Sequence, residues 1–81
     1  MNGVQYTIRL RREMFRKAKR LAGFPSDSAV AKAIGVHRST VKRILDGEIY
    51  PGPAFIAGMI MAFSPLRFDD LFEIVRVKVD A

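Results

Sequence analysis

The chain has 81 residues, with 14 lysines and arginines against 8 acidic residues, and 49% of its residues are hydrophobic. These values predict one small packed domain, residues 1–81, rather than a disordered chain. The absence of cysteine excludes disulfides and cysteine-bound zinc, and the single histidine, His37, excludes a histidine-rich metal site. We find no convincing Ser-His-Asp arrangement, no carboxylate pair at a plausible cleft and no Gly-rich loop after a strand. We therefore expect no enzyme activity, no metal, no cofactor and no small-molecule ligand.

The charge is distributed unevenly along the chain. Residues 1–45 contain 11 basic and 2 acidic residues, whereas residues 46–81 contain 3 basic and 6 acidic residues. This asymmetry indicates a polyanionic partner, either nucleic acid or an anionic membrane surface, although a merely solvated charged face has the same composition. The longest apolar run covers residues 54–63, half of the ~20 residues that a membrane span needs. Because the first residues are polar and do not resemble a signal peptide, we expect a cytoplasmic protein.

The first third of the chain changes its hydrophobic period. Residues 4–10 alternate between apolar and polar side chains, which predicts a short strand. From about Arg9 the apolar residues recur every three or four positions, which predicts a helix that ends at Gly23. Its apolar face is formed by Leu10, Met14, Ala18, Leu21 and Ala22. Its opposite, basic face is formed by Arg9, Arg12, Arg16, Lys19 and Arg20.

Five further elements follow. Ser26 and Asp27 are suitable N-caps for a short helix that ends at Gly35, and a second short helix is expected from Arg38 to Leu45. The next expected helix, residues 53–63, is apolar nearly all round, which indicates deep burial or a subunit contact. Asp69 is expected to cap a last helical turn from Asp70 to Glu73. Alternation resumes over residues 74–80, which predicts a second strand.

The two short helices have the spacing of a helix-turn-helix. Ala31 is small where the second helix must cross closely, and Gly35 permits the positive φ of a tight turn. Val30, Ile34, Val41 and Ile44 are expected to form the shared core that fixes the crossing angle. We expect the helix-turn-helix to occupy about residues 26–47.

This stretch, SDSAVAKAIGVHRSTVKRILDG, resembles the helix-turn-helix of lambda-repressor-like regulators, the Cro/XRE group. Its end is close to the family pattern Gly-Val-Ser-Arg-Ser-Thr-Val-Ser-Arg-Ile-Leu-Asn-Gly, and the resemblance extends over about residues 9–74. It implies a mainly α fold, a compact five-helix domain whose third helix lies in the DNA major groove. A short two-stranded pairing of residues 4–10 with 74–80 would be added to it. That pairing can form within one chain or across a two-fold axis, and we favour an antiparallel pairing within one chain.

The resemblance also implies which residues contact DNA. The base-reading candidates are His37, Arg38, Ser39 and Arg43. The phosphate-binding candidates are Ser28, Thr40 and Lys42. The basic face of the first helix adds Arg16, Lys19 and Arg20 on charge alone, and that face can equally be a solubilising outer face. His37 stands where the family usually has a small polar N-cap, so it either contacts DNA or only ends the turn. Asp27 departs from the family, which often has a phosphate-contacting glutamine there, and we interpret it as a cap or as a partner of the helix dipole.

The function implied is that of a sequence-specific regulator that binds double-stranded DNA, of the small Cro-like or immunity type found in phages and bacteria. Such a repressor blocks a promoter sterically. There are two alternatives to a repressor. One is an antitoxin that binds both DNA and a toxin, and the other is an accessory factor in recombination. The sequence does not decide between a homodimer and a monomer. Candidate dimer surfaces are Phe55, Met59, Ile60, Met61 and Phe63, or the strand with Val75, Val77 and Val79. We do not expect a membrane partner, because the apolar face of the first helix is needed for the core.

Overall fold

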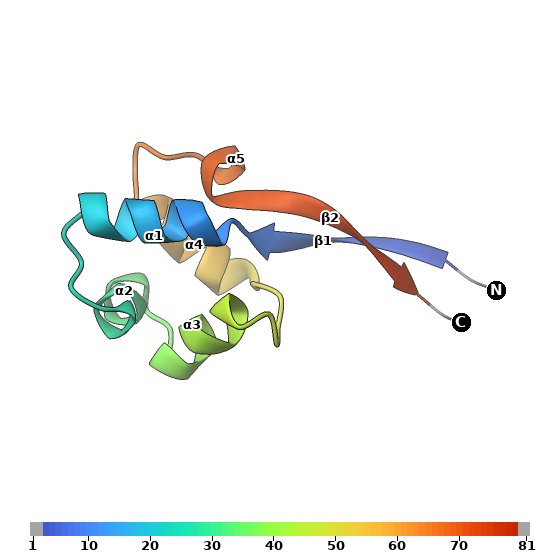
Figure 1. Ribbon diagram of the computed structural model, residues 1–81, viewed down its shortest axis with the longest axis horizontal. Coiled ribbons are helices and arrows are strands. Elements are labelled where there is room, and N and C mark those ends of the chain that lie inside the picture. Colours follow the sequence, from blue (N-terminus) through green and yellow to red (C-terminus); the bar gives the residue numbers. More distant parts are fainter. Residues whose placement is uncertain (1–2, 80–81) are drawn as a thin grey trace.

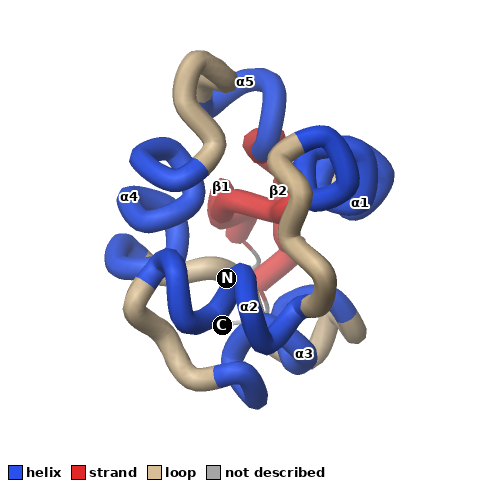
Figure 2. Tube along the Cα trace, turned by 90° about the vertical axis from the view of Figure 1, so that its left-hand side faces the viewer, coloured by secondary structure: helices blue, strands red, loops and turns tan. Residues whose placement is uncertain are grey.

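The computed structural model describes residues 3–79, which form a body of helices and a two-stranded ribbon (Figure 1). The elements in chain order are β1 (Gly3–Leu10), α1 (Arg12–Leu21), α2 (Asp27–Ile34), α3 (Arg38–Leu45), α4 (Pro53–Ala62), α5 (Phe68–Leu71) and β2 (Phe72–Val79). The ribbon leaves the body along the longest axis, and the extents of the molecule are 47 × 24 × 19 Å. Figure 2 looks along this axis from the helical end, with the helices arranged around the line of the ribbon.

The ribbon is an antiparallel pairing of β1 and β2 within one chain, as favoured from the sequence. The register runs from Gly3 opposite Val79 to Leu10 opposite Phe72. At the base of the ribbon, Leu10 and Phe72 are buried in the core. The expectation that the first helix begins near Arg9 is wrong, because both Arg9 and Leu10 belong to β1. Past the last pair, the amide of Arg11 still donates to the carbonyl of Leu71 at 2.8 Å, so α1 begins only at Arg12.

One core joins the helices to the base of the ribbon. The buried apolar residues are Leu10, Phe15, Ala18, Val30, Ala31, Ile34, Val41, Ile44, Phe55, Met59, Phe63, Leu71 and Phe72. Phe72 meets Phe55 edge to face, with ring centroids 6.2 Å apart, and stacks on Phe68. In α1 the core contacts come from Phe15 and Ala18, whereas Leu21, which was expected to point inward, is 79% exposed.

Helix α4 approaches α2 closely at a glycine. A Cβ atom at Gly58 would lie 2.7 Å from the Cβ of Ile34 and 2.8 Å from its carbonyl oxygen. These distances are shorter than van der Waals contact, so the approach requires a residue without a side chain. Gly58 therefore fixes how deeply α4 packs against the first half of the helix-turn-helix.

The expectation of a compact five-helix domain is wrong. Four helices have eight or ten residues, but α5 has only four, and two strands of eight residues each form a sheet that extends away from the helices. The last helical turn also differs from its expected position. It begins at Phe68, and Asp70 accepts a hydrogen bond from the Arg67 amide at 2.8 Å, so Arg67 rather than Asp69 is the N-cap. The helix ends at Leu71 because Phe72 turns into the core in an extended conformation.

Candidate nucleic-acid interface

Three local features place α2 and α3 in the arrangement expected of a helix-turn-helix. The Ser26 hydroxyl accepts a hydrogen bond from the Ala29 amide at 3.1 Å and caps α2, as predicted. Gly35 ends α2 with a φ of +77°, a left-handed conformation that glycine adopts without steric strain. His37 is the N-cap of α3, and its Nδ1 accepts a hydrogen bond from the Ser39 amide at 3.1 Å. Only three residues therefore separate the two helices.

Helix α3 has one buried and one exposed face. Val41 is fully buried and Ile44 is 5% exposed, and both pack with α2 in the core. Arg38, Lys42 and Arg43 are exposed. Because an α-helix turns 100° per residue, core contacts at positions 41 and 44 direct positions 42 and 43 outward, whereas position 38 lies only about 60° from position 41, at the edge of the buried face. The apolar packing thus presents three cations from a single rigid helix.

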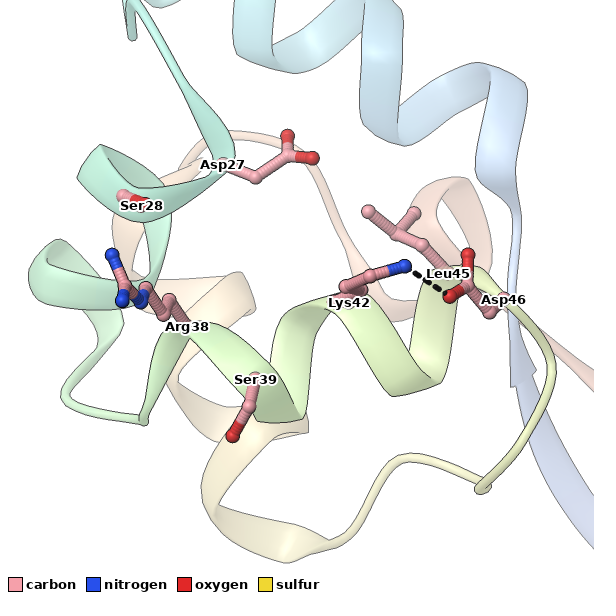
Figure 3. Close-up of a pocket in the computed structure, with 7 residues that line it drawn as sticks. All are labelled: Asp27, Ser28, Arg38, Ser39, Lys42, Leu45 and Asp46. Atoms are coloured by element: carbon pink, nitrogen blue, oxygen red, sulfur yellow. Dashed lines mark hydrogen bonds and ion pairs between the residues drawn. The ribbon is translucent and has the colours of Figure 1, made fainter.

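Several of the predicted site residues meet in one surface depression of about 490 Å³ between α2 and α3 (Figure 3). The depression is lined by Asp27, Ser28, Arg38, Ser39, Lys42, Leu45 and Asp46. In Figure 3 the side chain of Arg38 extends toward α2, whereas that of Lys42 points toward Asp46. Arg43 lies outside this lining set, and Thr40 is half-buried. The Nδ1 atom of His37 accepts the hydrogen bond from the Ser39 amide and lies 2.7 Å from the Ser39 hydroxyl. Its Nε2 atom is therefore left for an external ligand.

Three of the cations have acidic neighbours whose ion pairs were not predicted from the sequence. Lys42 Nζ lies 2.7 Å from an Asp46 carboxylate oxygen, and the hydrogen bond to this carboxylate raises the pKa of Lys42. Arg43 Nε lies 4.0 Å from Glu48. Lys19 Nζ lies 2.8 Å from Asp27, which is therefore an ion-pair partner of α1. Spacing by four residues was a readable signal for the first pair. The third joins residues on two different helices, so only the fold brings it together.

The predicted phosphate-binding residues of α1 do not gather at the depression. Arg16 and Arg20 line a separate shallow surface with Glu13, Met14 and Lys17. Lys19 is half-buried and paired with Asp27. Another cation of this helix, Arg12, donates from Nη1 to the carbonyl of Leu45 at 3.1 Å and so satisfies an otherwise unpaired carbonyl at the end of α3. In the geometry of the folded chain, Arg12 supports α3 more directly than Arg16 or Arg20.

The apolar candidates for a dimer surface belong mostly to the core. Phe55, Met59 and Phe63 are buried, Ile60 is half-buried, and Met61 is 79% exposed. Burial within the chain therefore explains Phe55 and Met59 of α4 and the adjacent Phe63, but not the exposed Met61.

Within residues 3–79, no helix combines the length and the apolar character that a membrane crossing requires. No family model, curated protein or solved structure matches the chain.

Proposed function

We propose that this protein is a sequence-specific regulator that binds double-stranded DNA and inserts α3 into the major groove. The observation that carries the proposal is the two-faced α3. Val41 and Ile44 are fixed in the core, and Arg38, Lys42 and Arg43 are exposed around the rest of the helix. The major groove of B-DNA admits an α-helix, and base edges there offer distinct patterns of donors and acceptors. The sequence resemblance of residues 26–47 to the Cro/XRE group supports the same function.

The side chains suggest different roles. Arg38 and Arg43 have planar guanidinium groups suited to a bidentate contact with guanine, whereas the compact ammonium of Lys42 suits a phosphate. Ser28 and the amides at the beginning of α2 supply hydrogen-bond donors for a second phosphate. Thr40 and Ser39 add hydroxyl groups on the same helix. These contacts would position α3 in the groove and leave sequence recognition mainly to the two arginines.

The acidic neighbours fit this role because they are displaceable. Lys42 with Asp46 and Arg43 with Glu48 form solvent-exposed ion pairs, a class of interaction that contributes little to stability. A DNA phosphate can replace the carboxylate as the partner of each cation. Near bound DNA, Asp46 and Glu48 repel the backbone and so reduce affinity for any duplex that lacks compensating base contacts. This arrangement favours discrimination over tight non-specific binding.

The experiment that tests the proposal is selection of bound duplexes from a random pool at near-physiological salt. The wild-type chain is expected to enrich one sequence motif. Arg38→Ala is expected to lose preference at one or two base pairs of that motif, by about 1–3 kcal/mol per lost contact. Arg20→Ala is the matched control, since Arg20 is an exposed arginine outside the depression.

Two results would contradict the proposal. An unchanged motif in Arg38→Ala would assign base reading to another surface. Absence of enrichment by the wild-type chain would leave only charge-driven binding, and specificity would then have to come from a partner protein, as in an antitoxin complex. A promoter fused to the selected sequence would show whether occupancy blocks transcription, the steric mechanism that we propose for regulation.

A further inference from the structure

The outer part of the ribbon, which we call the ribbon tip, consists of residues 3–7 of β1 and 75–79 of β2. Residues directly opposite each other in an antiparallel pair lie on the same face. The register therefore places Val4 with Lys78 and Tyr6 with Arg76 on one face, which we call the cationic face. Gln5, Thr7, Val75 and Val77 lie on the other face, which carries no charge. The two faces of the ribbon tip are thus chemically distinct.

The charge of the ribbon changes from its base to its tip. At the base, Glu73 accepts hydrogen bonds from Arg9 Nε at 2.8 Å and from Arg11 Nη1 at 3.1 Å, so both cations there have a carboxylate partner. The charged residues of the tip are Arg76 and Lys78. Neither forms an ion pair with an acidic residue among residues 3–79. The cationic face consequently carries positive charge that the described part of the chain does not neutralise.

The same face exposes an aromatic residue beside the cations. Tyr6 is 65% exposed and Val4 is 52% exposed, whereas Leu10 and Phe72, at the base of the same face, are buried. A tyrosine hydroxyl and basic side chains are typical contacts to DNA phosphates and sugars. Single exposed apolar residues are common, so Tyr6 alone would indicate nothing. Its position directly opposite Arg76 gives the face both a charge and a hydrogen-bond donor for a phosphate backbone.

The base of the ribbon also lies next to the end of α3. A surface depression lined by Arg9, Arg12, Ile44 and Tyr50 joins its base to the end of α3 and the loop that follows. From there the ribbon leads away from the helices (Figure 1). Five residue pairs of strand extend about 17 Å. The major groove is about 12 Å wide. The ribbon tip is therefore longer than the groove that would hold α3 is wide.

We propose that the cationic face of the ribbon tip is a second DNA-binding surface, which contacts the backbone of the duplex flanking the α3 site. This inference rests on the proposed function, because it takes the same duplex as the partner. A second copy of the chain is the less suitable occupant, since two-fold stacking of this face would bring arginines and lysines of like charge together. Contacts to the backbone raise affinity without adding base preference.

The test compares two variants that each lose two positive charges. Arg76→Gln with Lys78→Gln changes the ribbon tip. Lys17→Gln with Lys32→Gln changes two exposed helical lysines that line neither the α3 depression nor the ribbon. The net charge is the same in both variants, so any general electrostatic effect is matched. The affinity of each for the selected duplex is measured over a series of salt concentrations, with flanks of about ten base pairs on both sides of the motif.

We expect the tip variant to bind about 3- to 30-fold more weakly at ~0.1 M salt. Its plot of log K against log salt should be shallower than that of the wild type, with a slope smaller in magnitude by about 1–2. Its base preference should not change, and shortening the flanks should remove the difference from wild type. The control variant should show a much smaller loss and a nearly unchanged slope. Because the altered side chains are outside the core, both variants should keep the wild-type melting temperature.

Other outcomes overturn the inference in distinguishable ways. If the tip variant behaves like the control while Arg38→Ala still loses base preference, the ribbon does not bind DNA and the proposed function stands. If the tip variant instead abolishes a dimer seen by sedimentation, without affecting DNA affinity, the cationic face binds a second copy. If the wild-type chain binds no duplex, the ribbon inference and the proposed function both fail.

Discussion

The helix-turn-helix and the ribbon tip both present cations, but they hold them in different ways. In the helix-turn-helix, Val30, Ala31 and Val41 are at most 2% exposed, so the core fixes the helix that carries Arg38. In the ribbon tip, Val4 and Tyr6 are more than half exposed, and the strands are held mainly by each other. An isolated two-stranded ribbon is at best marginally stable in water. Base recognition needs the fixed geometry of the first region, whereas phosphate contacts tolerate the looser geometry of the second.

The largest expected effect comes from enlarging the crossing of α2 and α3. Ala31 is 2% exposed at this crossing. Ala31→Leu should destabilise the protein by about 1–3 kcal/mol or more, because the core has no room for the added carbons. Ala33→Leu, at an exposed position of the same helix, is the control and should change stability by less than about 0.5 kcal/mol. Thermal unfolding measures both, and equal melting temperatures would contradict the packing described for Ala31.

A somewhat smaller loss is expected for Gly58→Ala. Alanine normally stabilises a helix by about 1 kcal/mol relative to glycine. Here its Cβ would meet Ile34 at 2.7 Å, so we expect a net destabilisation of about 1–3 kcal/mol. Ala57→Leu adds carbon atoms at the neighbouring exposed position and should be nearly neutral. A gain in stability for Gly58→Ala, measured by denaturant unfolding, would show that α2 and α4 separate easily.

The cap of α3 gives a smaller effect. His37→Ala removes the acceptor of the Ser39 amide and should cost about 1 kcal/mol of stability. His37→Ser supplies another acceptor at the same position and should recover most of this loss. DNA affinity measured in parallel separates the two interpretations of His37. If His37→Ser is stable but binds the selected duplex poorly, the imidazole itself contacts DNA.

The smallest expected effect is a local dependence of the ribbon on pH. The hydrogen bond from Arg9 lowers the pKa of Glu73 below its ordinary value. The stabilising contribution is therefore complete at neutral pH and is lost as the pH falls below about 4 and through the folded-state pKa. Intrinsic amide exchange slows as the pH falls from 5 to 3. The exchange of the β1 and β2 amides should slow less than this, because the ribbon opens more often once Glu73 is protonated. Glu73→Gln should abolish this difference, and an identical profile in that variant would assign the effect to another group.

The sequence predicted the segment that contains α2 and α3 better than the rest of the chain. Its signals are local: Ser26 caps α2, Gly35 supplies a positive φ, and α3 runs from Arg38 to Leu45 as expected. Leu10 was assigned both to the strand and to the first helix because it continues the alternating pattern of a strand and the three-to-four spacing of a helix. Only its pairing with Phe72, far away in the sequence, decides between them.

The candidate site was also predicted only in part, because residues close in the sequence could be grouped correctly and residues from different elements could not. Ser28, Arg38, Ser39 and Lys42 line one depression, as their spacing on two short helices suggested. Arg16 and Arg20 were grouped with them on charge alone, and the rotation of α1 directs these two residues to another surface. The sequence predicted that the two end segments pair, but not the register that places Tyr6 directly opposite Arg76.

The most direct test of the central claim is a map of backbone amide shifts when a duplex with the selected sequence is added to the ¹⁵N-labelled protein. We predict the largest changes at Ser28 and over Arg38 to Arg43, at the exposed side of the helix-turn-helix. Smaller changes are expected at Tyr6 and Arg76 in the ribbon tip. Changes concentrated in α4 and α5, with α3 unaffected, would contradict the claim that α3 is the helix that reads DNA.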